Sequence, residues 1–159
     1  MPYPSTNLRR SRSAPIQRGR VVRKVRILLA DDRPMICEAV ANLLKPTYEI
    51  VGCVGDGQAL IQAAMKMNPD VIVTDISMPV LNGIEAANIL RDSGSRSRII
   101  FLTIHQDLAF IEACFVAGAL AHVSKPRMRA DLLCAIQKAL VGHSFVSPMA
   151  STAASSSER

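Results

Sequence analysis

The chain has 159 residues, of which 49% are hydrophobic and 20% are charged, and its formal net charge is +6. This length suits one domain of ordinary size with short tails, and the apolar content excludes global disorder. No apolar run approaches the roughly 18 residues needed to cross a bilayer, so we expect no membrane span.

The positive charge is concentrated at the N-terminus. Eight basic residues and no acidic residue lie within residues 1–26, whereas the eleven remaining basic residues face all thirteen acids, a net charge of −2. We interpret residues 1–23 as a disordered basic arm in solvent. Contact with nucleic acid or an anionic membrane is the alternative. An organelle transit peptide is disfavoured because no apolar stripe accompanies the arginines.

Apolar segments then alternate with segments of helical periodicity. The apolar segments are residues 25–30, 48–54, 70–75, 98–103 and 119–123. Helical spacing of apolar residues follows, at Ile36, Val40, Leu43 and Leu44, at Leu108, Ile111 and Phe115, and at Leu132, Ile136 and Leu140. Continuous apolar strands are typical of a sheet covered on both faces. The alternation predicts an α/β fold, a single domain with a doubly wound, five-stranded parallel sheet.

The four cysteines are widely spaced and include no CxxC pair; they are Cys37, Cys53, Cys114 and Cys134. This pattern argues against both a zinc site and a disulfide framework. We therefore expect buried free thiols in a reducing cytosol, and hence a cytoplasmic protein.

Polar side chains follow the predicted strands at their carboxyl ends, where open parallel sheets bind ligands. Asp31 and Asp32 follow the first strand, and Asp75 follows the third. Thr103 ends the fourth strand, and Lys125 follows the fifth. Each residue alone has an ordinary explanation, such as a helix cap or a solvated loop. Their joint occurrence at one edge favours a shared site.

The charge of this predicted site indicates its ligand. Three adjacent carboxylates repel one another and favour bound cations. Mg²⁺ accepts a few carboxylates, a backbone carbonyl and waters, and it commonly acts beside phosphate. His105 alone is insufficient for zinc. The residues therefore predict a site for Mg²⁺ and a phosphoryl group.

Four segments, "LLADDRP", "VTDISMPVLNG", "FLTIH" and "VSKP", occur in this order. In order and spacing they resemble the motifs of two-component response-regulator receiver domains, over about residues 24–142. The resemblance implies a flavodoxin-like (βα)5 domain. We place this receiver domain at residues 24–146 and a disordered tail at residues 147–159.

The resemblance also implies a role for each residue of the site. Asp75 is similar to the phosphoacceptor, which takes a phosphoryl group from a phosphohistidine on a histidine kinase or a phosphotransfer protein. Lys125 and the Thr103 hydroxyl would bind phosphoryl oxygens. The implied Mg²⁺ ligands are Asp31, Asp32, Asp75 and the backbone carbonyl of Ser77. Such a domain is not an enzyme beyond its own phosphorylation and slow autodephosphorylation.

Phosphorylation would draw Thr103 inward and repack the surface of the last two strands and helices. The family usually carries Tyr or Phe where this sequence has His122. We expect a surface imidazole there, with a rotating or titrating His122 as the alternative. Ser77 and His105 lie two residues beyond Asp75 and Thr103, positions that in this family modulate the lifetime of the aspartyl phosphate.

The segments "TIHQD" and "GHSFVSP" resemble the LuxR-type (NarL/FixJ) branch, whose receivers precede a helix-turn-helix domain. About a dozen residues follow, too few for such a domain. We therefore expect a stand-alone receiver that contacts a downstream protein target or acts as a phosphate sink in a phosphorelay. The alternatives are a nucleic-acid-associated regulator that uses the basic arm, a truncated regulator, and an aspartyl-phosphate phosphatase. Homodimerisation stays open.

Overall fold

The structure is a computed structural model that describes residues 22–149. Most of the expected basic arm, and the expected tail beyond Met149, lie outside this range. The strands are β1 (Arg26–Ala30), β2 (Glu49–Val54), β3 (Val71–Thr74), β4 (Arg98–Thr103), β5 (Ala121–Ser124) and β6 (Phe145–Val146). The helices are α1 (Pro34–Leu44), α2 (Gly57–Met67), α3 (Gly83–Asp92), α4 (Leu108–Val116) and α5 (Met128–Leu140). A 3-10 turn at Lys125–Arg127 precedes α5.

The strands form one parallel sheet in the order β2-β1-β3-β4-β5-β6. This arrangement confirms the predicted α/β class and the five alternating strands. The sixth strand has only two residues, Phe145 and Val146, and it pairs with β5. Such a short element carries no periodic signal in the sequence.

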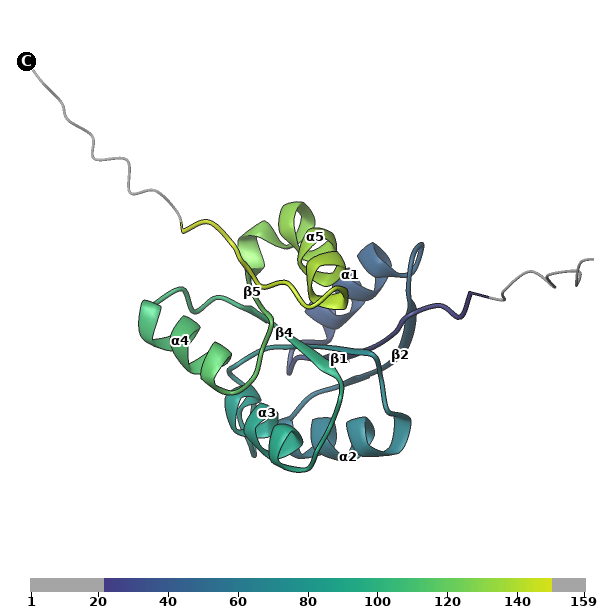
Figure 1. The fold of residues 1–159 in the computed structure, drawn as a ribbon, viewed down its shortest axis with the longest axis horizontal. Helices are drawn as coiled ribbons and strands as arrows, with labels where there is room; N and C mark the ends of the chain where they lie inside the picture. The colour runs from purple at the N-terminus through teal and green to yellow at the C-terminus, as the bar shows by residue number, and fades with distance from the viewer. Residues whose placement is uncertain (1–21, 150–159) are drawn as a thin grey trace, which may run out of the picture.

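Helices cover both faces of the sheet (Figure 1). Helices α1 and α5 lie together on one face, and α2 and α3 lie on the other. Alternate side chains of β1 divide between the two layers: Ile27 and Leu29 pack on the α1 and α5 side, and Leu28 and Ala30 on the opposite side. The expectation of a doubly covered sheet is therefore correct, and it explains the uninterrupted apolar strands.

Helix α4 differs from the other helices because it is apolar and poorly covered. Only Cys114 of this helix is buried. Leu108 and Val116 are 71% and 70% exposed, and Ile111 and Phe115 are half-buried. Apolar spacing thus located the helix but did not predict how little of it is covered.

Two loops that lead from strands into helices are fixed by caps. Asp56 accepts a 2.7 Å hydrogen bond from the Ala59 amide at the start of α2. At the start of α3, Asn82 and Glu85 form a reciprocal capping box. Each cap satisfies amide groups that a helix N-terminus otherwise leaves free. These helices therefore begin next to the carboxyl edge of the sheet.

The segment after α5 returns to the sheet instead of leaving it. The amide of Phe145 donates to the carbonyl of Leu120, and the amide of Ser147 donates to that of His122. Ser147, which the sequence interpretation assigned to the tail, is only 5% exposed. Its hydroxyl donates to Asp131 at 2.7 Å and accepts from the Ser124 amide at 3.1 Å. Ordered packing therefore extends past residue 146.

The expectation of four buried free thiols is wrong. Cys37 of α1 and Cys53 of β2 are joined by a disulfide. Cys114 is free and buried, and Cys134 is free and exposed. The pairing depends on how α1 packs beside the edge strand β2, which cysteine spacing does not encode.

Within residues 22–149, no helix has the length and hydropathy of a membrane span.

Candidate functional site

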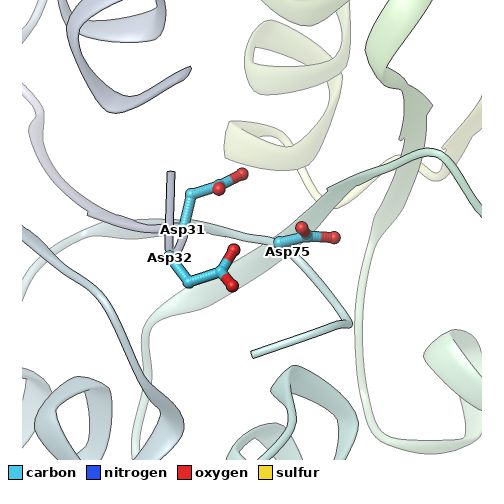
Figure 2. A group of neighbouring side chains, drawn as sticks. All are labelled: Asp31, Asp32 and Asp75. Atoms are coloured by element: carbon cyan, nitrogen blue, oxygen red, sulfur yellow. The ribbon is translucent and has the colours of Figure 1, made fainter. Parts of the chain in front are cut away.

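Three aspartates meet at the carboxyl edge of the sheet (Figure 2). Asp31 and Asp32 follow β1, and Asp75 follows the neighbouring strand β3. One carboxylate oxygen from each lies within 4.8 Å of the other two. Asp31 and Asp75 are each 6% exposed, whereas Asp32 is open to solvent. The predicted acidic cluster therefore exists, with one of its members facing outward.

Lys125 neutralises part of this negative charge. Its Nζ lies 2.7 Å from Asp31 Oδ2 and 2.8 Å from Asp75 Oδ2. Burial alone lowers the pKa of Lys125, but hydrogen bonds and charge interactions with Asp31 and Asp75 outweigh burial and raise it. The ammonium group therefore stays charged between two carboxylates.

The main chain fixes the orientation of Asp75. Its Oδ1 accepts a 2.7 Å hydrogen bond from the Ile76 amide, and its own amide donates to the Ala30 carbonyl at 2.9 Å. Because Lys125 holds Oδ2, the two carboxylate oxygens have different environments. Oδ1 faces the main chain and Oδ2 faces the ammonium group.

The loop that follows Asp75 requires close approach of the backbone. A Cβ atom at Gly83 would overlap the carbonyl oxygen of Asp75, so only glycine fits there. The amide of Leu81 donates to the Pro79 carbonyl around Val80, whose φ is +68°. A β-branched residue with positive φ is a strained exception that surrounding structure must hold. The loop is therefore tightly specified next to the acidic cluster.

Thr103, Ser77 and His105 form a linked group on the other side of Asp75. Thr103 is fully buried, and its Oγ1 accepts from the His105 amide at 3.2 Å. The His105 ring lies 2.7 Å from Ser77 Oγ through Nε2. The ring also packs on Phe110 with a centroid distance of 4.6 Å. The structure thus joins Thr103, Ser77 and His105 by contacts that sequence spacing did not specify.

His122 is buried, and the expectation of a surface imidazole is wrong. It is 1% exposed because β5 lies between two strands in a sheet covered on both faces. Its Nε2 lies 2.8 Å from the His105 carbonyl oxygen, which can only accept, so Nε2 carries the hydrogen. Nδ1 has no partner among the described residues. Burial lowers the pKa of His122 and favours the neutral ring.

A further polar group at this edge was missed by the sequence interpretation. Gln106 Nε2 donates to Ser124 Oγ at 2.9 Å, which links the β4–α4 loop to β5.

Asp131 in the first turn of α5 accepts hydrogen bonds from Arg127, and these are the main reason why the pKa of Asp131 is lowered. The sequence signal for Asp131 is its spacing of four residues from Arg127.

The aspartate cluster fits a magnesium ion by its chemistry. Three carboxylates offer hard oxygen donors in one place, two of them buried and one exposed. Mg²⁺ prefers such ligands and retains waters, which the exposed side of the cluster can accommodate. An acidic triad of this kind is typical of the Mg²⁺ site of receiver domains.

Residues 27–137 match the family model of the response regulator receiver domain. This match covers most of the chain, and the chain belongs to that family. As a receiver domain it is a two-component signalling module with a phosphorylation site, and it is not a catalytic enzyme. Membership implies a partner kinase.

Individual relatives agree with this assignment. The chain is 34% identical over 135 residues to the transcriptional regulatory protein PdtaR of Mycobacterium tuberculosis, covering 84% of this chain and 65% of that protein. It is 30% identical over 127 residues to the transcriptional regulatory protein DegU of Brevibacillus brevis, covering 79% of this chain and 54% of that protein. The chain thus spans between half and two thirds of these relatives.

A solved structure is similar in fold as well as in sequence. The crystal structure of a LuxR-family two-component response regulator from Aurantimonas sp. SI85-9A1 matches with a TM-score of 0.75 and 34% identity. The match covers 79% of this chain and 91% of that one. LuxR-family regulators are therefore among the relatives, as the segments near His105 and His143 indicated.

Proposed function

We propose that Asp75 accepts a phosphoryl group from a phosphohistidine on a histidine kinase or a histidine phosphotransfer protein. The observation that carries this proposal is the placement of Asp75 Oδ2, buried and 2.8 Å from Lys125 Nζ, within the acidic cluster. Oδ2 attacks the phosphorus atom, the phosphorus–nitrogen bond breaks, and the imidazole leaves with the electron pair. Hydrolysis by water later returns phosphate and the free carboxylate.

The other residues of the site orient and neutralise the phosphoryl group. We assign Asp31, Asp32, Asp75 and the Ser77 carbonyl as the residues that hold Mg²⁺, which when bound supplies positive charge to the phosphoryl oxygens. Lys125 already lies beside Oδ2 and needs only a small shift to contact a phosphoryl oxygen. The Thr103 hydroxyl binds another oxygen, because Thr103 ends the neighbouring strand β4. Positioning and charge account for most of such a transfer.

The proposed output is a change at the β4–β5 edge. When Thr103 Oγ1 turns toward the phosphoryl group, it gives up its bond from the His105 amide. His105 also bonds Ser77 and His122, so this one change alters contacts on both neighbouring segments. We propose that the repacked surface binds a downstream protein target in the cytoplasm. We propose that the receiver domain comprises residues 24–146 and also Ser147, which is buried against β5 and α5.

A second candidate is the receiver part of a transcriptional regulator. The relatives PdtaR and DegU are transcriptional regulatory proteins, and this chain spans only part of each. Eight basic residues within residues 1–26 could add phosphate contacts with nucleic acid. Binding to duplex DNA that weakens steeply with salt, and that is lost on deletion of residues 1–24, would favour this candidate.

The test of the phosphorylation site uses acetyl phosphate and Mg²⁺ as phosphodonor and metal. Wild type should gain one phosphoryl group by intact-protein mass spectrometry, and Asp75→Asn should gain none. Asp92→Asn is the matched control, since Asp92 is an exposed aspartate at the end of α3. Phosphorylation of Asp75→Asn at the wild-type rate would contradict the assignment.

A further inference from the structure

The disulfide connects α1 to the edge of the sheet next to the acidic cluster. Cys37 and Cys53 have Cα atoms 6.3 Å apart and are separated by 16 residues in sequence. This Cα separation lies within the usual range for protein disulfides. Cys37 is 8% exposed, whereas Cys53 is exposed on β2, an edge strand of the sheet. One half of the cystine is therefore internal and the other half faces solvent.

Cys37 lies beside Asp31, and Cys53 is linked to Asp31 through the next residue, Val54. Cys37 Sγ lies 3.8 Å from the carbonyl oxygen of Asp31. On the other side, Cys53 pairs with Leu29 in the sheet, and the next residue, Val54, accepts the Asp31 amide at 3.0 Å. Cys37, Asp31 and Asp75 also line the same small hollow. The disulfide therefore joins two elements that both contact the main chain of Asp31, the first aspartate of the cluster.

We propose that Cys37 and Cys53 form a reversible thiol–disulfide modification site that controls the affinity of the aspartate cluster for Mg²⁺. Disulfides in proteins of reducing compartments are usually transient or redox-sensing, which suits a bond with one exposed half. The coupling to Mg²⁺ rests on the proposed function of the cluster. The redox couple itself does not.

The chemistry needs only low-molecular-weight thiols and disulfides. In reduction, a glutathione thiolate attacks the exposed Cys53 sulfur, the Cys37 thiolate leaves, and a second glutathione releases Cys53 and forms oxidised glutathione. Oxidation is the reverse: the two protein thiols lose two electrons and two protons, and oxidised glutathione becomes two thiols. No other reactant is required.

The direction of the coupling follows from restraint. The disulfide fixes the first half of α1 against β2. The Asp31–Asp32 turn leads into α1, and the Asp31 amide donates to the carbonyl of Val54 at the end of β2. Ordering a site before the ligand arrives reduces the entropy that binding must overcome. The oxidised protein should therefore bind Mg²⁺ more tightly. We expect about five-fold, the low end of typical couplings, because backbone hydrogen bonds already restrain Asp31.

The first experiment measures the redox couple on the full chain with Cys134→Ser, which removes the free exposed thiol. The protein is equilibrated in mixtures of reduced and oxidised glutathione, alkylated, and analysed by peptide mass spectrometry. Cys37 and Cys53 should change from alkylated to protected together, while Cys114 does not pair. Absence of a Cys37–Cys53 disulfide in every mixture would overturn the proposal without affecting the phosphorylation site.

The second experiment measures Mg²⁺ affinity by titration calorimetry on the same protein in oxidised and reduced form. The oxidised form should bind about five-fold more tightly, and by linkage saturating Mg²⁺ should shift the glutathione equilibrium by the same factor. Cys53→Ser in the same background should match the reduced form under both conditions. Equal affinities in the two forms would overturn the coupling alone. No Mg²⁺ binding in either form would contradict the proposed function as well.

Discussion

Two parts of the carboxyl edge of the sheet hold their polar side chains in different ways. In the acidic half, formed by Asp31, Asp32 and Asp75, main-chain amides and Lys125 fix the two buried carboxylates. In the histidine half, formed by Thr103, His105 and His122, the Thr103 hydroxyl and the His122 ring bond to the main chain of His105. The His105 ring in turn bonds to the Ser77 hydroxyl on the neighbouring loop. The acidic half is preorganised for a ligand, whereas the contacts of the histidine half can be exchanged.

The helices that follow the two halves also differ, in how many of their side chains are buried. The turn after β1 leads into α1, whose Cys37, Val40 and Leu44 are buried. The loop after β4 leads into α4, where only Cys114 is buried. Segments with few buried apolar contacts open at lower free energy than the core. The comparison therefore predicts that chemistry depends on the acidic half and that response depends on the histidine half.

Removing the ammonium group should disrupt the acidic half most strongly. Lys125→Met leaves the buried Asp31 and Asp75 carboxylates without their shared cation, and it removes the donor proposed for the phosphoryl group. The rate of phosphorylation by acetyl phosphate should fall about 100-fold, as when one charge-stabilising donor is lost from an active site. The rate is measured on phosphate-affinity gels. Lys66→Met, on the exposed side of α2, is the control and should keep the wild-type rate.

Adding a side chain at Gly83, where the backbone lies against the Asp75 carbonyl, tests how rigid the acidic half is. The Cβ of Gly83→Ala would overlap the Asp75 carbonyl oxygen, so the loop must shift. The free energy of unfolding should fall by about 2 to 3 kcal/mol, as for other overpacked sites. Urea denaturation measures this change. Gly55→Ala meets no atom nearer than 4.0 Å and should cost much less; equal losses would mean that the loop adapts freely.

Titration of His122 tests the histidine half. Its pKa is lowered by burial, so below about pH 6.5 the unfolded chain binds more protons than the folded one. The contribution of His122 to stability is complete above that pH and is lost as pH falls toward the folded pKa. The slope cannot exceed about 1.4 kcal/mol per pH unit for one proton.

The measurement compares urea unfolding at pH 7.5 and 5.5, both chosen as about one unit either side of the ordinary histidine pKa. His122→Gln keeps a donor for the His105 carbonyl but cannot titrate, so its loss of stability on acidification should be smaller than that of wild type. His143→Gln, on an exposed turn, is the control. If both variants lose as much stability as wild type, His122 is not the titrating group.

The smallest effect is expected where the C-terminal segment contacts β5. Ser147→Ala removes the hydroxyl that bonds Asp131 and leaves the Ser124 amide without its acceptor. Unfolding should become easier by about 1 kcal/mol, and phosphorylation of Asp75 should be unchanged. Ser144→Ala, on the exposed turn before β6, provides the comparison. A changed phosphorylation rate in Ser147→Ala alone would mean that the two halves are not independent.

The acidic half could be predicted from sequence because one rule locates it. Strand ends of a parallel sheet meet at one edge, so Asp31, Asp75 and Lys125 had to lie close together once the alternation of strands and helices was recognised. The same rule could also have placed His122 inside, since β5 belongs to a sheet covered on both faces. Treating its polar ring as a surface group gave side-chain chemistry more weight than position.

Other features depended on packing that no local pattern encodes. The Cys37–Cys53 pair forms because α1 lies beside β2, and sequence spacing alone favoured free thiols. The contact between Ser77 and His105 joins loops from different strands. The exposure of Leu108 is also outside the reach of periodicity, which predicts that a helix has an apolar face and not whether another element covers it.

The direction of β6 has a consequence for how a partner approaches. Because β6 runs parallel to β5, the chain leaves the sheet at the same edge that carries Asp75 and Lys125. A bulky group joined after Met149 would start on the side from which a phosphohistidine reaches Asp75 in the proposed transfer. Its size and tether length would then decide steric access to the proposed phosphoacceptor, so fusion tags for kinase assays belong on the opposite end of the chain.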